Sequence, residues 1–139
     1  MYEETTATLE KRQSLSIRQI VVIAIHAFIG WALCAATMGI GMAVTSIQTA
    51  LIVHAIGAPI FFAGVSFNYF RKFGYTSPLK TALIFTGFVI VVDFFVVAML
   101  INKSFDMFTD PLGTWIPFAL IFASTYLTGT IVTKNSSPN

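Results

Sequence analysis

The sequence predicts an all-α fold, an integral membrane four-helix bundle. Three observations predict it: a composition that is 56% hydrophobic and only 10% charged, four apolar stretches of membrane-spanning length, and Lys and Arg residues that fall almost entirely on one side. An average soluble domain is about a quarter charged, and a chain of 139 residues could not hide this much apolar surface from water. We therefore expect the lipid bilayer as its surroundings and no nucleic-acid partner.

The predicted spans follow from the length of the apolar stretches. A spanning helix needs about 20 mainly apolar residues. The chain offers four such stretches, at residues 17–40, 45–69, 79–101 and 114–133. Together they form one transmembrane domain, 17–133. Residues 1–16 are then a polar N-terminal lead, and residues 134–139 are a polar tail.

Local signals place the ends of these helices. Ser16, with Gln19 three residues later, predicts a capping box at the start of the first helix. Pro78 suits the start of the third helix, because its missing N–H would have no helical partner there. Gly39 and Gly41 predict a tight turn between the first two helices.

The basic residues predict the orientation, since Lys and Arg gather in the cytoplasmic segments of membrane proteins. With the spans given above, one side of the membrane receives Lys11, Arg12, Arg18, Arg71, Lys72, Lys80 and Lys134. Only Lys103 falls on the other side. We therefore expect an up-down-up-down bundle with both termini in the cytoplasm.

Three His or Asp residues fall deep inside the predicted spans, His26, His54 and Asp93, whereas Arg18 and Lys80 lie at the ends of theirs. An Asp at the centre of a membrane helix costs roughly 2.5 to 3.5 kcal/mol, so such residues are rare and often functional. With a helical rise of about 1.5 Å per residue, His26 lies about 14 Å from the cytoplasmic end, Asp93 about 21 Å and His54 about 22 Å. We expect His54 and Asp93 to meet near mid-membrane, with His26 on the cytoplasmic approach.

Other polar side chains could support this site. Thr86 shares a helix face with Asp93, and Ser124 pairs with Thr128 on the fourth helix, with Ser124 at nearly the depth of His26. Pro59 predicts a bend in the second helix, because it removes an N–H and frees a backbone carbonyl. Such a bend serves helix packing as readily as a binding site.

Small residues predict close helix packing around these positions. On the first helix, one face carries a stripe at spacings of three or four residues that is small enough for another helix to approach closely: His26, Gly30, Cys34, Met38 and Gly41. The only cysteine, Cys34, belongs to this stripe and is interpreted as a packing residue.

Three functions remain open. The first is proton or cation handling in transport, at His54 and Asp93 with His26 as an approach. The second is a membrane redox subunit, in which His26 and His54 ligate haem b, or both histidines and Asp93 hold a metal ion. The third is an accessory or assembly subunit with no chemistry of its own, in which the histidines only fix helix register.

The sequence argues against enzyme chemistry of the soluble type. It contains no nucleophile paired with a base, no cysteine pair and no phosphate-binding glycine loop. We expect a transporter of this size to act as a homodimer or within a larger membrane complex.

Overall fold

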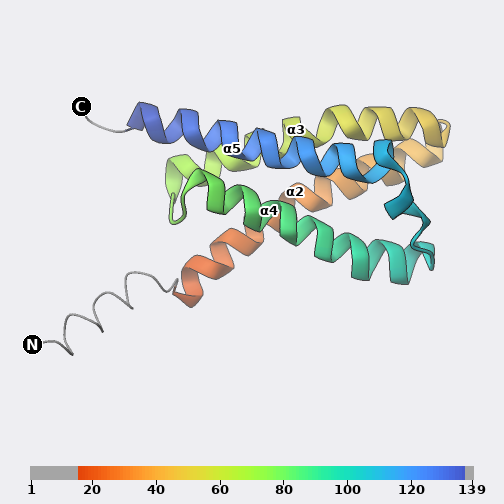
Figure 1. Cartoon of the computed structure of the whole chain (residues 1–139), viewed down its shortest axis with the longest axis horizontal. Helices are drawn as coiled ribbons and strands as arrows, with labels where there is room; N and C mark the ends of the chain where they lie inside the picture. The colour runs from red at the N-terminus through yellow and green to blue at the C-terminus, as the bar shows by residue number, and fades with distance from the viewer. Residues whose placement is uncertain (1–15, 137–139) are drawn as a thin grey trace, which may run out of the picture.

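The structure is a computed structural model that describes residues 16–136, and within this range all the regular elements are helical (Figure 1). Most of the polar lead and the last residues of the tail lie outside this range. Four helical units are long and apolar enough to cross a membrane. They are α2 (Ile17–Val44), α3 (Ile47–Lys72), α4 (Pro78–Val92) with its continuation η1 (Asp93–Asn102), and α5 (Ile116–Ser136) preceded by η3 (Pro111–Trp115).

Hydroxyl side chains cap the starts of three of these helices. The capping box predicted for α2 is confirmed: the Gln19 amide donates to Ser16 Oγ at 3.3 Å, and the Ser16 amide donates to Gln19 Oε1 at 3.1 Å. Ser46 accepts the Thr49 amide of α3, and Ser77 accepts the Lys80 amide of α4. Each cap satisfies backbone N–H groups that lack a partner within the helix.

The turn predicted at Gly39 and Gly41 is wrong. Both glycines lie inside α2, which continues to Val44. The connection to α3 is only Thr45 and Ser46, because the Thr45 amide still bonds to Gly41 and Ser46 already caps the next helix. Gly41 serves close packing instead, since a Cβ there would lie 2.9 Å from the Cβ of Ala50 on α3.

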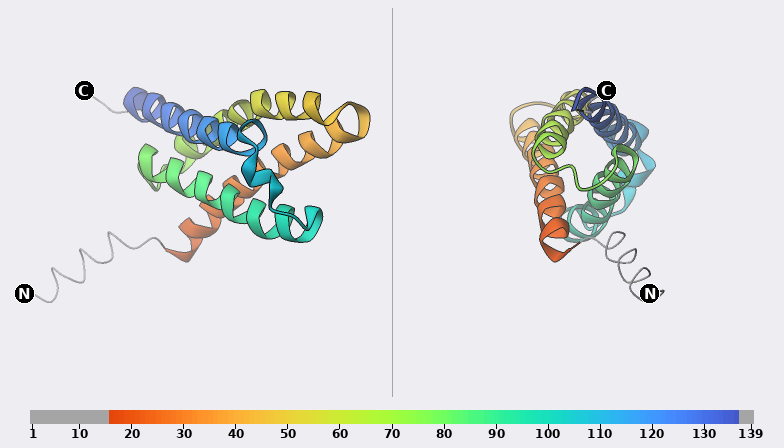
Figure 2. Two further views of the ribbon diagram at one scale, coloured as in Figure 1. Left: turned by 45° about the vertical axis from the view of Figure 1, so that its right-hand side comes forward. Right: turned by 90° about the vertical axis from the view of Figure 1, so that its left-hand side faces the viewer.

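Helices that are neighbours in the bundle are not always consecutive in the sequence. α3 packs along both α2 and α5, and α4 packs along α5 and more briefly against α2. The end-on view in Figure 2 shows the four helices arranged around a common axis. The most extensive contact therefore joins α3 and α5, which are not consecutive.

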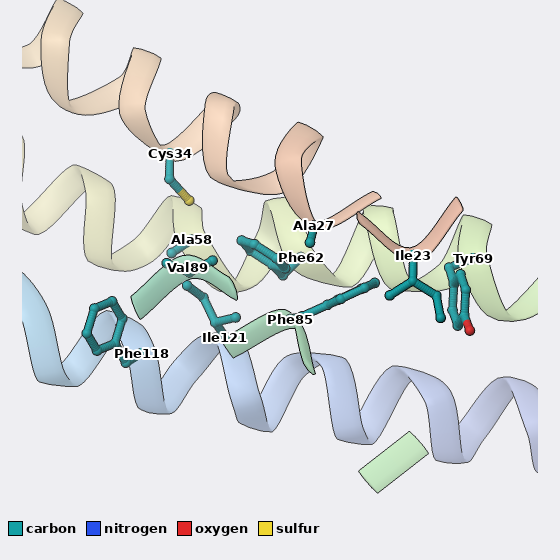
Figure 3. Packing of buried hydrophobic residues seen from close by; sticks show 10 residues of the cluster. All are labelled: Ile23, Ala27, Cys34, Ala58, Phe62, Tyr69, Phe85, Val89, Phe118 and Ile121. Atoms are coloured by element: carbon teal, nitrogen blue, oxygen red, sulfur yellow. The ribbon is translucent and has the colours of Figure 1, made fainter. Parts of the chain in front are cut away.

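Aromatic and aliphatic side chains fill the core between the helices (Figure 3). Phe62 and Phe85 are fully buried, with ring centroids 6.1 Å apart. Phe62 can reach this position because Gly30 has no side chain: a Cβ there would lie 2.6 Å from the Cζ of Phe62. The small residue in the α2 stripe thus brings α2 onto α3.

A buried hydroxyl network closes the α3–α4 connection. Tyr69 is fully buried, and its hydroxyl lies 2.8 Å from Thr76 Oγ1 and accepts the Thr76 amide at 3.2 Å. Thr76 Oγ1 in turn lies 2.5 Å from Thr81 Oγ1 on α4. This network ties the short connection to both helices.

Large apolar side chains cover the outside of the bundle. Ile56 is 61% exposed, Leu83 58% and Leu127 58%. Such a surface suits lipid and not water. Together with the four apolar helices, it indicates an integral, multi-pass membrane protein.

Candidate functional site

A cavity of about 570 Å³ lies among all four helical units, toward the end of the bundle where α2 meets α3 and η1 leads toward α5. This end is on the right in Figure 1. The C-terminal half of α2, the first two turns of α3, and η1 form its walls. Residues 104–110, η3 and the first turns of α5 complete it. Two of the three predicted ionisable residues, His54 and Asp93, line this cavity.

Asp93 lies where α4 passes into the π-helix η1. π-Helical turns are rare in proteins, and those that occur are often found at functional sites. The Asp93 carboxyl is partly buried, and its Oδ1 accepts a hydrogen bond of 2.8 Å from Trp31 Nε1 on α2. This bond joins α2 to the third span and fixes one carboxyl oxygen, while Oδ2 makes no hydrogen bond within residues 16–136.

His54 reaches the same cavity from α3. Its Nδ1 is buried without a hydrogen-bond partner among the described residues. No hydrogen bond or ion pair joins His54 to Asp93 in the described part of the chain, since Trp31 is the partner of the carboxyl. The two residues thus share a cavity without direct pairing.

His26 lies elsewhere, near the opposite end of the bundle. Its Nδ1 donates to the Val22 carbonyl at 2.8 Å, and Asn68 Nδ2 on α3 donates to its Nε2 at 3.0 Å. The ring also packs edge-on against Tyr69 and Phe73, at centroid distances of 5.5 and 5.4 Å. With both ring nitrogens engaged, His26 fixes the register of α2 on α3.

The predicted supporting hydroxyls do not line the cavity. Ser124 donates to the Ile121 carbonyl of its own helix at 3.1 Å. Thr86 Oγ1 is buried with no hydrogen-bond partner among the described residues, and Thr128 is only partly buried. α3 continues through Pro59 without interruption, from Ile47 to Lys72.

The structure adds residues that the sequence analysis missed. Trp31 lies 14 residues into α2, a depth of about 21 Å that matches the estimate for Asp93, so depth could have identified it. Two further carboxylates line the cavity: Asp106, which is exposed, and Asp110, whose Oδ1 accepts the Leu112 amide at 3.1 Å. None of the lining residues is Lys or Arg.

The ligand set suggested for haem or a metal does not come together. His26 borders a separate groove with Asn68, while His54 and Asp93 line the main cavity. Within residues 16–136, no three His, Cys, Asp or Glu side chains are grouped as metal ligands. The geometry therefore gives no support to a site that combines both histidines.

Comparison with known proteins gives no relative from which to transfer a function: no protein-family model, curated protein or solved structure matches this chain. Its function is inferred from its own residues and their geometry.

Proposed function

We propose that this multi-pass membrane protein handles protons or cations in transport, at a site formed by His54 and Asp93. The main support for this proposal is the shared cavity. A carboxyl group, Asp93, and an imidazole with an unpartnered ring nitrogen, His54, line one cavity of about 570 Å³ among the membrane helices. Ionisable residues at such depths mark ion pathways and proton relays in pumps and transporters.

The two groups have complementary chemistry. A carboxyl can bind and release a proton or act as the counter-ion of a cation, and an imidazole can accept or donate a proton. Trp31 holds Oδ1 of Asp93 in place, which leaves Oδ2 for a proton or cation. His54 also lines the cavity, and its buried Nδ1 makes no bond to a described neighbour, so the imidazole is a second group that can take up a proton.

A band of buried aromatic residues separates this site from the other end of the bundle. Figure 3 shows Phe62 and Phe85 lying between Cys34, which lines the cavity, and Tyr69. Both phenyl rings are fully buried. Transport therefore requires a rearrangement of these rings or their helices that opens the site to the second side, as alternating access demands.

We further propose that both termini are cytoplasmic and that the cavity opens to the opposite side. Arg71 and Lys72 end α3, and Lys134 lies in the last turn of α5. In Figures 1 and 2 the start of α2 and the end of α5 lie toward the same end of the bundle. Lys103, between the lining residues Asn102 and Ser104, is the only basic residue that the predicted spans assign to the other side.

The test is proton flux into liposomes that contain the purified protein and a pH-sensitive dye. A proton gradient or a membrane potential should drive faster acidification than in protein-free liposomes. Asp93→Asn keeps an oxygen that can accept the Trp31 bond but cannot exchange a carboxyl proton, so the protein-dependent flux should fall at least tenfold. His54→Gln should also lower it.

A matched control is Thr130→Val on α5, whose hydroxyl bonds only to Tyr126 of its own helix. This variant should retain the flux of the unmodified protein. Flux unchanged by Asp93→Asn would contradict the proposal and assign Asp93 to helix register. Flux equal to that of protein-free liposomes under both driving forces would also contradict it.

A further inference from the structure

We propose that the cavity binds an organic cation with an apolar body, whose positive charge is placed at Asp93. This inference rests on the proposed function and adds the class of substrate. The cavity's size, its charge and the chemistry of its walls are independent observations that support it.

The size favours an organic ligand over a bare inorganic ion. Pockets for small organic molecules commonly measure about 300 to 1,000 Å³, whereas one water takes about 30 Å³. The cavity, at about 570 Å³, lies within the first range. A dehydrated metal cation needs several oxygen ligands within about 2.6 Å, and within residues 16–136 no three His, Cys, Asp or Glu side chains are grouped to supply them.

The charge favours a cation. Asp93, Asp106 and Asp110 line the cavity, and no Lys or Arg is among the lining residues. Even with Lys103, which lies between the lining residues Asn102 and Ser104, acidic groups outnumber basic ones, and this distribution attracts a positive ligand and opposes an anionic one. Asp93 is partly buried whereas Asp106 is exposed, so a charge at Asp93 is screened less by water than one at Asp106.

The walls suit an apolar body attached to that charge. Met38, Met42 and Met107 contribute flexible, polarisable side chains that adapt to ligands of varied shape. Trp31 lies one hydrogen bond from Asp93 and also lines the cavity. An indole beside a carboxylate attracts organic cations, because the aromatic face adds an interaction of about 0.5 to 2 kcal/mol to that of the counter-ion.

The two tryptophans allow a direct binding test. Trp115 is 51% exposed and does not line the cavity, so Trp115→Phe leaves Trp31 as the single emitting indole, inside the site. This protein in lipid nanodiscs is titrated with benzyltrimethylammonium, and separately with neopentylbenzene, its neutral isostere. Both titrations are made at constant ionic strength, with KCl alone as the control for salt.

The proposal predicts a saturable change in Trp31 emission with the cation, an affinity at least tenfold higher than for the neutral isostere, and no response to KCl. Asp93→Asn should remove the preference for the cation while leaving binding of the neutral isostere unchanged. Equal affinities for the two probes would overturn the proposal, as would a preference that survives Asp93→Asn. The comparison of probes needs only the protein with Asp93 intact, so it decides the question even if Asp93→Asn fails to fold.

The outcome is separable from that of the flux experiment. Proton flux that depends on Asp93, without a preference for the organic cation, would overturn the substrate class and leave the proposed function standing. Cation preference without flux would leave the binding site standing and overturn transport.

Discussion

Replacing Gly30 by Ala should destabilise the contact between α2 and α3. A Cβ at this position would lie 2.6, 2.7 and 2.9 Å from three ring carbons of Phe62, well inside the ordinary contact distance of about 3.5 to 4.0 Å. The ring would have to move by about 1 Å, but it is fully buried and packs on Phe85. Overpacking of this kind costs about 1 to 3 kcal/mol.

The matched control is Gly87→Ala on α4, where a new Cβ would meet nothing within 4 Å. Both variants gain the same helix propensity of about 1 kcal/mol, so the difference between them isolates the clash. Both variants are unfolded in mixed micelles with increasing dodecyl sulfate, and unfolding is monitored by the loss of helical circular dichroism. The free energy of unfolding of Gly30→Ala should be about 1 to 3 kcal/mol lower than that of Gly87→Ala. A Gly30→Ala protein as stable as Gly87→Ala would refute the packing described for Phe62.

Other predictions address the remaining features. Tyr69→Phe removes the hydroxyl that holds the α3–α4 connection and should lower the free energy of unfolding in the same assay by about 1 to 3 kcal/mol; no loss would mean that the network is not stabilising. Asn68→Leu should lower the free energy of unfolding by about 0.6 to 1.7 kcal/mol, because His26 Nε2 loses its hydrogen-bond donor. Asn68→Gln, which keeps an amide donor, should lower the free energy of unfolding less. Ser104→Cys, made in a Cys34→Ser protein, should react with a membrane-impermeant maleimide added outside intact cells; labelling only after the cells are opened would reverse the proposed orientation.

The helices are the part of this protein that its sequence predicts best. A bilayer requires about 20 consecutive apolar residues in each span, and this requirement is visible without any tertiary information. The Ser16 and Gln19 capping box is equally local. The turn between the first two helices was wrong because glycine marks both turns and close helix contacts, and only the partner Ala50 distinguishes the two roles of Gly41.

The partners of the buried polar groups were less predictable. Depth alone suggested Ser124 beside His26, but α2 packs on α3, so the partner is Asn68. Depth estimates give height in the membrane and not which helices are neighbours. Asp93 is a different case: its partner Trp31 lies at the matching depth, but an indole in an apolar span does not by itself reveal that its N–H donates to a carboxyl on another helix.

A proton site at His54 and Asp93 requires that Asp93 gains and loses a proton. Infrared difference spectra of the protein in lipid, recorded between alkaline and acidic buffer, contain a carboxyl C=O band for every carboxylate that gains a proton. Subtracting the spectra of Asp93→Asn isolates the band of Asp93. We predict a carboxyl band that is present in the unmodified protein and missing from the variant. Identical spectra for the two proteins would mean that Asp93 does not exchange a proton, which would contradict a proton site at His54 and Asp93.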